Sequence, residues 1–318
     1  MSGAGARSGD GSEETIGQRI ARAAAAKLAF DAIRVDYPPQ TEVHARLEGV
    51  RLSARGREPG IPCGGAMLVA PNGVGKTEAI KSLVLHAAGG VPDGERRTPV
   101  LHIEIDSSGN PASVPTSILR ALRVPRPDLG KEELRWLKAV HEMKVAGVEL
   151  AVFDEFNRAL KRRTMSGPIA TCIREKIMDT GVCPVAFVGS EDAGVVLKKV
   201  PDLVERLDEK IDLAPLDWLF PGDDAIAIAF LRDLDQASVD RDLLPRPSAL
   251  GDARTAELLC RAGRGRIRRM VKIVRFAMGA AVERRAWCIS KEDLVQAVDN
   301  YAIAGGLADA NPFLDAAA

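Results

Sequence analysis

The stretch at residues 66 to 87, AMLVAPNGVGKTEAIKSLVLHA, constrains the fold more than any other part of the chain. A short apolar run leads into a glycine-containing turn and then into an amphipathic run that opens with Lys76 and Thr77. A buried strand that turns directly into a helix aims backbone N–H groups at one point, and this geometry binds phosphate. The stretch fits the pattern G-x-x-x-x-G-K-[ST] except that Ala70 holds the first position. The sequence therefore predicts a nucleotide-binding α/β domain.

Each residue type in this loop suits a task at a phosphate site. Lys76 is expected to reach the β- and γ-phosphates, and the Thr77 hydroxyl is expected to bind Mg²⁺. Gly73 and Gly75 let the backbone approach the ligand closely, whereas Ala70 ends the strand and is tolerated there if its φ is negative. An accidental Gly-Lys-Thr in a strand-turn-helix is the alternative, which the flanking pattern disfavours. ATP is the predicted ligand, and its predicted contacts are Pro71, Asn72, Gly73, Val74, Gly75, Lys76, Thr77 and Glu78.

Apolar strands alternate with helical runs through the middle of the chain. We expect strands at 66–70, 99–105, 148–156, 183–189 and 210–216, with helices at 75–88, 115–122, 130–146 and 166–179. Continuous apolar strands that alternate with helices indicate a five-stranded parallel sheet covered on both faces. Beyond residue 217 only helical runs follow, at 223–235, 252–262, 265–282 and 291–304.

These patterns predict five segments along the chain. They are a disordered tail at 1–14, an N-terminal helical segment packing on the core at 15–60, an α/β core at 61–216, a small all-helical lid at 217–305 and a C-terminal tail at 306–318. A capping box formed by Ser290 and Asp293 is expected to begin the last helix of the lid.

A second pair of candidate residues follows the strand within VELAVFDEF. Asp154 and Glu155 come directly after the apolar residues Leu150 to Phe153. An Asp at the carboxyl end of a neighbouring parallel strand can hold Mg²⁺ through water, and the adjacent Glu can polarise the attacking water. Two acids that merely cap the next helix are the alternative. Asp154 and Thr77 are the predicted metal-binding residues.

Composition bounds the partners and the location. Lys and Arg number 44, and so do Asp and Glu, so the net charge is zero and only a local basic patch could bind nucleic acid. The 5 cysteines are scattered and never form C-x-x-C, which favours a reducing cytoplasm over a disulfide framework or zinc site. No apolar run reaches the length of a membrane span, so no membrane partner is expected.

NGVGKT and LAVFDEF, followed by a long helical segment, together resemble the Walker A and Walker B motifs of the AAA+ ATPases. The resemblance implies that Ser190, after the strand VAFVG, is the polar sensor residue near the γ-phosphate. It implies that Arg206, just before the fifth strand, is the arginine finger that enters a neighbouring subunit's site. Either Arg266 or Arg268 would be the sensor arginine of the lid, and the glycine spacing favours Arg266.

A narrower set of motifs is similar to the TniB/TnsC transposition proteins over roughly residues 30 to 313. They are DYP before the P-loop, DEFNRAL, VGSEDA, ERLDEKIDLAPLDW and the C-terminal NPF. The chain departs from the family pattern at two positions. Ala70 replaces the first glycine of the phosphate-binding pattern, and Leu207 stands where the family more often has Phe. The resemblance implies an ATP-bound homo-oligomer, a ring or filament, on duplex DNA. It would mark target DNA and recruit a transposase, with a target-selection protein as a further partner.

Two basic clusters are candidate DNA contacts. One is NRALKRRT, from which Lys161, Arg162 and Arg163 are taken as the DNA-binding residues. The other runs from Arg261 to Arg285, with nine basic residues and one acid, and a solvated helix face is an equal interpretation of it. Neither cluster has interleaved aromatic residues, so we expect contacts to the DNA backbone with little sequence specificity. The NPF segment is interpreted either as a loose end or as a partner-docking anchor.

Three alternative functions remain open on the sequence alone. The first is another AAA+ role, as a helicase loader, an initiator-like factor or a signalling ATPase. The second is a P-loop small-molecule kinase, against which the Asp-Glu pair and Arg206 argue. The third is a module that holds ATP as a structural switch and hydrolyses little of it.

Overall fold

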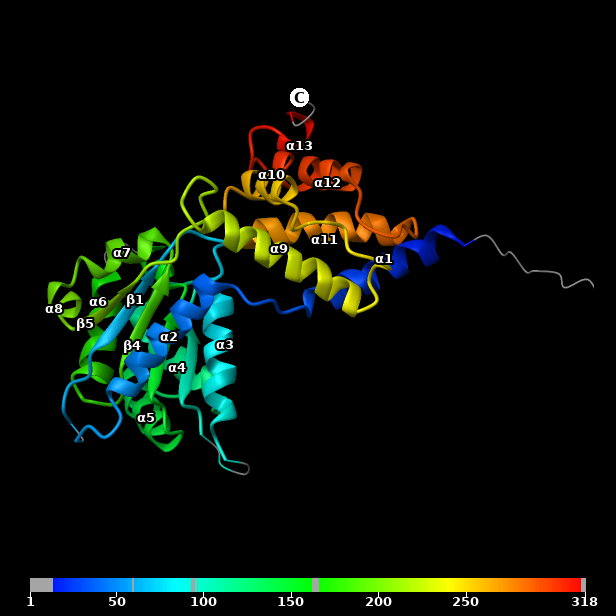
Figure 1. The fold of residues 1–318 in the computed structure, drawn as a ribbon. Helices are drawn as coiled ribbons and strands as arrows, with labels where there is room; N and C mark the ends of the chain where they lie inside the picture. Colours follow the sequence, from blue (N-terminus) through cyan, green and yellow to red (C-terminus); the bar gives the residue numbers. More distant parts are fainter. Residues whose placement is uncertain (1–13, 59, 93–94, 96, 162–165, 316–318) are drawn as a thin grey trace, which may run out of the picture. The chain divides into compact units, whose positions relative to one another are not determined.

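The structure is a computed structural model that describes residues 14–58, 60–92, 95, 97–161 and 166–315. It separates into two compact units (Figure 1). The core unit holds Asp36–Pro215 together with Arg266–Arg268. The helical unit holds the chain up to Val35, Leu216–Gly265 and the residues from Arg269 onward.

The core unit is built on a five-stranded sheet in the order β2 (Val100–Glu104), β3 (Leu150–Asp154), β4 (Val185–Gly189), β1 (Gly65–Val69) and β5 (Leu207–Ile211). Every pairing is parallel. Parallel strands need a crossover connection between them, and the helical runs that alternate with the strands in the sequence supply it. The parallel α/β core followed by an all-helical region is the fold class that the sequence predicts.

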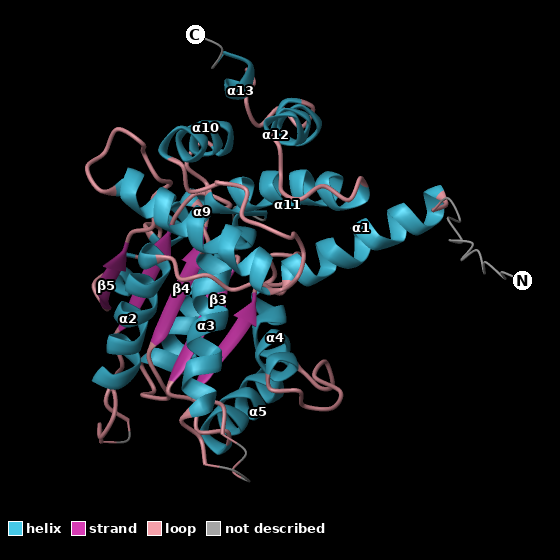
Figure 2. Ribbon diagram, turned by 45° about the vertical axis from the view of Figure 1, so that its right-hand side comes forward, coloured by secondary structure: helices cyan, strands magenta, loops and turns pink. Residues whose placement is uncertain are grey.

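Alternate residues of the strands pack into two separate apolar clusters, one on each face of the sheet. Leu150 and Val152 join the cluster under α2 (Pro38–Ser53) and α3 (Lys76–Gly89), whereas Ala151 and Phe153 join the opposite cluster. The helices that contribute to that opposite cluster include α4 (Val114–Ala121), α5 (Glu132–Val145), α6 (Ser166–Ile173) and α7 (Glu191–Leu197). The sheet is therefore buried on both faces, with α2 and α3 together on one side (Figure 2).

Short irregular elements complete the core unit. They are the 3₁₀ turns η1 (Pro111–Ser113) and η2 (Phe156–Lys161), the π turn η3 (Arg174–Met178) and the short helix α8 (Pro201–Val204). The sequence predicts one helix over 166–179, and the structure divides it into α6 and the π turn η3.

The helical unit contains α1 (Ile16–Asp31), α9 (Asp223–Asp240), α10 (Ala253–Gly263), most of α11 (Ile267–Glu283), α12 (Lys291–Val298), the π turn η4 (Asp299–Ile303) and α13 (Pro312–Asp315). The predicted capping box of Ser290 and Asp293 begins α12. Asn311 and Phe313 of the NPF segment are both buried, and the Asn311 side chain donates to the carbonyl of Val295 at 3.0 Å. This segment is therefore packed in its own unit rather than forming a loose end.

Two boundaries differ from the sequence prediction. The helix α1 groups with the helical unit, since Arg22 donates to the carbonyls of Val282 and Glu283 and Arg275 pairs with Asp31 at 2.6 Å. The helix α2 packs on the core, as expected. The fifth strand is Leu207–Ile211 rather than 210–216, because it is an edge strand whose half-exposed, charged sequence LDEKI lacks an apolar run. Among the described residues, no helix combines the length and apolar character needed to cross a membrane.

Candidate nucleotide-binding site

The candidate site lies at the carboxyl edge of the central strands. Val69, the last residue of β1, pairs with Gly189, the last residue of β4, and Asp154 at the end of β3 pairs with Glu104. The loop 70–75, the acids after β3 and Ser190 after β4 therefore leave the sheet at the same edge. This is the edge at which ligands bind in open parallel sheets.

Two left-handed glycines shape the loop. Gly73 has φ +87° and Gly75 has φ +108°, whereas Ala70 keeps a negative φ and is 2% exposed. Such turns expose successive N–H groups to an anion. Gln40, in the first turn of α2, supports the loop because its side-chain amide donates to the Gly75 carbonyl at 2.9 Å. The φ of +108° favours glycine at this position, and a Cβ there would also displace the Gln40 amide, whose Nε2 would lie 2.2 Å away.

Lys76 places a buried ammonium inside this loop. Its side chain is 9% exposed, and its Nζ donates to the carbonyls of Ala70 at 2.6 Å and Pro71 at 2.8 Å. Burial lowers the pKa of Lys76, against the nearby carboxylates of Asp154 and Glu155, which act to raise it. The amine is therefore a desolvated cation whose charge an incoming phosphate would compensate.

Asp154 sits beside Thr77, as a shared magnesium site requires. The Thr77 hydroxyl lies 3.3 Å from the Asp154 Oδ2, His102 Nε2 lies 3.2 Å from the same oxygen, and the Glu155 N–H donates to the other oxygen at 2.8 Å. Burial acts to raise the pKa of Asp154, but these hydrogen bonds, that of His102 first, outweigh it and hold the pKa below its usual range. A hydroxyl and an ionised carboxylate are ligands that suit Mg²⁺, which takes few protein ligands beside substrate phosphates.

Glu155 adopts a left-handed backbone conformation directly after β3. Its φ is +56°, a left-handed conformation that non-glycine residues adopt rarely and that occurs preferentially at functional sites. Its side chain is 39% exposed, with the Asn157 amide 3.4 Å and Arg158 Nε 3.7 Å from its Oε2. Asn157 also accepts a hydrogen bond from the Ser190 N–H at 3.1 Å. A single amide therefore connects the acid after β3 to the predicted sensor position after β4.

Arg266 adds an unsatisfied cation at the loop. Its Nε is buried and makes no hydrogen bond among the described residues. A Cβ on Gly73 would lie 3.8 Å from the Arg266 Cβ, and the charge of Arg266 contributes to lowering the pKa of Lys76. Arg268 is exposed and contacts the loop through its backbone N–H, which donates to the Gly73 carbonyl at 3.0 Å. Two cations, one of them lacking a hydrogen-bond partner for a buried nitrogen, fit a polyphosphate.

Residues 31–214 match the family described as Bacterial TniB protein. The chain belongs to that family. No curated protein matches it.

Solved structures resemble this TniB-family chain in fold. The Aeropyrum pernix ORC2 protein in its ADPNP–ADP complexes aligns with a TM-score of 0.60 and 15% identity, covering 84% of this chain and 68% of that one. The A. pernix ORC1 protein in complex with DNA gives 0.55 and 20%, covering 84% and 66%. Cdc6p from Pyrobaculum aerophilum gives 0.56 and 16%, covering 83% and 68%. At these identities the likeness establishes the AAA+ fold alone.

Arg206 lies away from the nucleotide loop of this TniB-family chain. It directly precedes Leu207, which pairs with Gly65 at the start of β1, whereas the loop follows Val69 at the end of β1. Five residues of strand span about 16 Å at roughly 3.3 Å per residue. The Arg206 side chain is 39% exposed, and its Nε lies 3.0 Å from Asp179 Oδ1.

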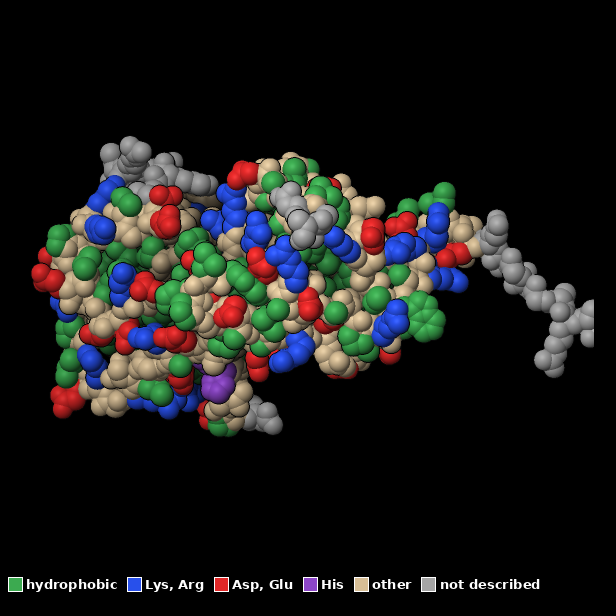
Figure 3. Space-filling view, turned by 45° about the horizontal axis from the view of Figure 1, so that its top comes forward, with side chains coloured by type: hydrophobic (Ala, Val, Ile, Leu, Met, Phe, Trp, Pro, Cys, Tyr) green, Lys and Arg blue, Asp and Glu red, His purple; other side chains and the backbone are tan. Residues whose placement is uncertain are grey.

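The predicted DNA contacts stay untested. Arg162 and Arg163 lie outside the described residues, and the structure describes the backbone of Lys161 in η2 but not its side chain. Five of the nine basic residues in the second cluster pair with acids of the helical unit, and acidic side chains are interspersed with basic ones on the face drawn in Figure 3. Its ion pairs include Arg261–Glu257, Arg264–Asp309, Arg275–Asp31, Arg284–Asp293 and Arg285–Glu14. A solvated, internally paired face is the better interpretation of this cluster.

Four residues near the predicted ones escaped the sequence analysis. Only His102 carried a signal, as the lone imidazole within the otherwise apolar run PVLHIEI. Asn157 lies inside the DEFNRAL motif without any pattern that singles it out. Gln40 and Asp179 act across long sequence separations, on Gly75 and Arg206 respectively, which no local pattern reveals.

Proposed function

We propose that this chain is an ATP-dependent regulator of DNA transposition. In this proposal it is a magnesium-dependent AAA+ ATPase of the cytoplasm that assembles as a homo-oligomer on duplex DNA. The ATP-bound assembly marks target DNA and recruits a transposase, with a target-selection protein as a further partner. Membership of the TniB family over residues 31–214 supports the transposition role.

The observation that supports a homo-oligomer is the distance between Arg206 and the nucleotide loop of its own subunit. Arg206 precedes Leu207, which pairs with the first residue of β1, whereas the loop follows the last residue of β1, about 16 Å away along the strand at 3.3 Å per residue. An arginine side chain is too short to cover that distance. Arg206 is therefore suited to a phosphate held by a neighbouring subunit, where a cation stabilises the charge that develops during phosphoryl transfer.

The remaining residues divide the chemistry among them. The N–H groups of the loop and the Lys76 ammonium bind the phosphates, while Thr77 and Asp154 hold Mg²⁺, which supplies charge neutralisation when bound. The Glu155 carboxylate orients and polarises the attacking water. Ser190, connected to Glu155 through the Asn157 side chain, is the polar sensor. Arg266 compensates phosphate charge from the residues preceding α11. Pro71, Asn72, Val74 and Glu78 complete the proposed nucleotide contacts.

Duplex DNA is proposed as the platform for assembly. The A. pernix ORC1 structure of similar fold was solved in complex with DNA, and the basic segment Lys161–Arg163 follows directly from the Glu155 region in sequence. With net charge zero and 4% aromatic residues, contacts to the phosphate backbone are favoured over base stacking. We expect little dependence on DNA sequence.

The test combines turnover with assembly. ATP hydrolysis and particle size are measured with and without duplex DNA of random sequence, for the wild type and for Lys76→Ala and Glu155→Gln. We expect large ATP-dependent particles on DNA for the wild type, none for Lys76→Ala, and persistent particles with slow turnover for Glu155→Gln. A chain that stays monomeric with ATP and DNA, yet phosphorylates a small molecule, would establish the kinase alternative instead.

The transposition role needs its own readout. DNA carrying the ATP-bound assembly is presented to a purified transposase, and retention of the transposase is compared in ATP and ADP. Retention in ATP alone supports the proposal. Retention of a helicase instead of the transposase would favour the loader or initiator-like alternative, which shares every nucleotide-binding residue.

A further inference from the structure

Arg206 lies just before β5 and belongs to a network of ion pairs with Asp179 and Arg174. The Nε edge of the Arg206 guanidinium faces Asp179 Oδ1 at 3.0 Å. Its two terminal amino groups bind no other described residue, and the side chain is 39% exposed. The Asp179 Oδ1 is buried without a hydrogen bond, so Arg206 is the close cation that compensates it.

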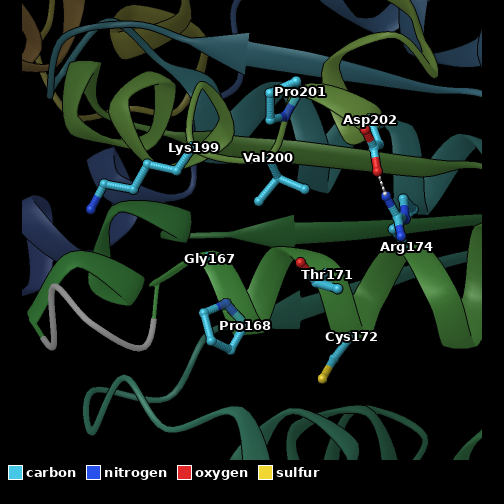
Figure 4. Close-up of a pocket in the computed structure, with 9 residues that line it drawn as sticks. All are labelled: Gly167, Pro168, Thr171, Cys172, Arg174, Lys199, Val200, Pro201 and Asp202. Atoms are coloured by element: carbon cyan, nitrogen blue, oxygen red, sulfur yellow. Dashed lines mark hydrogen bonds and ion pairs between the residues drawn. The ribbon is translucent and has the colours of Figure 1, made fainter.

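Asp179 is itself held from the other side by Arg174. The Arg174 Nε lies 3.4 Å from Asp179 Oδ2, and the Arg174 side chain is only 14% exposed. Arg174 also pairs with Asp202 at 2.9 Å, the contact drawn in Figure 4, and with Glu175 at 3.4 Å. Asp179 is therefore paired with a cation on each side, Arg206 at its Oδ1 and Arg174 at its Oδ2.

We propose that Asp179 is the positioning residue for Arg206: it holds the Nε edge of the guanidinium and directs the terminal amino groups toward a phosphate on a second copy of this chain. The ion pair with Asp179 lies on the Nε side of the guanidinium. A guanidinium has five N–H donors in a rigid fork, so the four N–H groups of its terminal amino groups stay available to a phosphate. This inference rests on the proposed function, in which Arg206 completes a neighbour's site.

A purely structural role for the same ion pair makes a different prediction. Losing a partly exposed ion pair of purely structural importance would lower the melting temperature and leave the turnover of the folded protein unchanged. A positioning role concentrates the loss in the reaction, because a misplacement of about 1 Å can cost a hundredfold in rate. The two roles therefore separate when turnover, ATP affinity and thermal stability are measured on the same variant.

The first experiment compares Asp179→Ala with Asp202→Asn, a matched control that removes the 78% exposed partner of Arg174. For Asp179→Ala we expect DNA-stimulated ATP turnover to fall about ten- to a hundredfold, with ATP affinity of the isolated subunit and melting temperature close to wild type. Asp202→Asn should retain wild-type turnover. Full turnover by Asp179→Ala beside an inactive Arg206→Ala would overturn the inference while leaving the proposed function intact.

The second experiment assigns the defect to one side of the subunit contact. Lys76→Ala, inactive itself but with intact Asp179 and Arg206, is mixed with Asp179→Ala. Turnover should return, because the Lys76→Ala subunit lends a positioned arginine to the intact loop of its neighbour. The double variant Lys76→Ala/Asp179→Ala should fail to restore Arg206→Ala. Restoration of Arg206→Ala but not of Asp179→Ala by the Lys76→Ala subunit would show that Asp179 acts through folding.

Two further outcomes are decisive. The mixture of Arg206→Ala with Lys76→Ala is the positive control for the mixing experiment. If this mixture regains no turnover, the double variant Asp179→Ala/Arg206→Ala is compared with Arg206→Ala alone. Equal residual turnover supports the inference, since Asp179 then acts only through Arg206, and a further loss overturns it. Wild-type turnover by Arg206→Ala would refute the arginine-finger role in the proposed function itself, and Asp179 would have nothing to position.

Discussion

Replacing Lys76 by Met should separate nucleotide binding from folding. Methionine keeps the length and apolar stem of lysine and removes only the ammonium. In the free protein that ammonium is buried at 9% exposure and donates to the carbonyls of Ala70 and Pro71. Its loss leaves bound phosphates without the cation inside the loop. Removing one partner of a buried, hydrogen-bonded charge pair costs about 2–5 kcal/mol. The ATP dissociation constant should therefore rise roughly thirtyfold to several thousandfold, at about 1.4 kcal/mol per tenfold.

The stability of the nucleotide-free protein should change far less. Two buried carbonyls lose a donor, which costs about 1–3 kcal/mol, but the variant no longer buries a charge whose desolvation lowers the pKa of Lys76. Because these effects oppose each other, we expect the free energy of unfolding to stay within about 2 kcal/mol of wild type.

The pH dependence of stability shows the sign of the desolvation effect at Lys76. The pKa of Lys76 is lowered in the folded state from its usual 10.5, so the native state releases this proton first as the pH rises. The desolvation penalty is present at neutral pH and disappears through the lowered pKa toward 10.5. Wild type should therefore gain stability relative to Lys76→Met over that window.

The assays are titration with a fluorescent ATP analogue and urea unfolding of the same two proteins without nucleotide. Unchanged ATP affinity together with a large loss of stability would refute the reasoning, because Lys76 would then be a structural residue of the loop.

Three further predictions address other parts of the chain. Glu155→Gln should keep ATP affinity and slow hydrolysis by orders of magnitude, because the amide preserves the shape and lacks the charge that polarises water; wild-type turnover would leave Glu155 as a helix cap. Changing Arg162 and Arg163 together to Ala should weaken binding equally on any duplex and reduce the slope of affinity against salt, with ATP binding intact; a loss confined to one DNA sequence would contradict backbone contacts. Burial raises the pKa of Cys260 in the helical unit to about 11 and also raises that of Cys183 in the core, so both thiols should be alkylated at pH 8 only after local unfolding. ATP with Mg²⁺ at a hundred times its dissociation constant should slow labelling of Cys183 about a hundredfold, and equal rates with and without nucleotide would argue against binding in the core unit.

The nucleotide loop and the acids after β3 were predictable because their constraints are local. A strand, two left-handed glycines and a helix start lie within a few consecutive residues, so Gly73, Gly75 and Lys76 reveal the turn directly. The position of Asp154 was predictable because the carboxyl ends of parallel strands lie at the same edge of a sheet. An acid at the end of a buried apolar run must therefore lie at that edge. Ala70 also fits its expected place, as a buried residue of negative φ at the end of β1.

The remaining features depend on partners distant in sequence. β5 is an edge strand, so its charged residues can face solvent. Because the prediction searched for an apolar run, it placed this strand at 210–216 instead of Leu207–Ile211. The helix α1 pairs with α11 through Asp31 and Arg275, 244 residues apart. The basic cluster from Arg261 to Arg285 resembled a DNA-binding face because its acids, among them Asp31 and Asp309, come from other segments.

In the isolated subunit, the three charged groups proposed for the reaction already have partners within the chain. The Lys76 ammonium rests on two loop carbonyls, Glu155 lies against Asn157 and Arg158, and Arg206 faces Asp179. A charge held by hydrogen bonds or an ion pair avoids the cost of burial without compensation. The same partners keep each group near the place where a phosphate, a water or a neighbouring subunit would meet it, so little reorganisation is needed on binding. Assembly then supplies what one subunit lacks, since Arg206 lies at the opposite end of β1 from its own loop. Hydrolysis by a lone subunit should accordingly be slow even when its loop, Asp154 and Glu155 are intact.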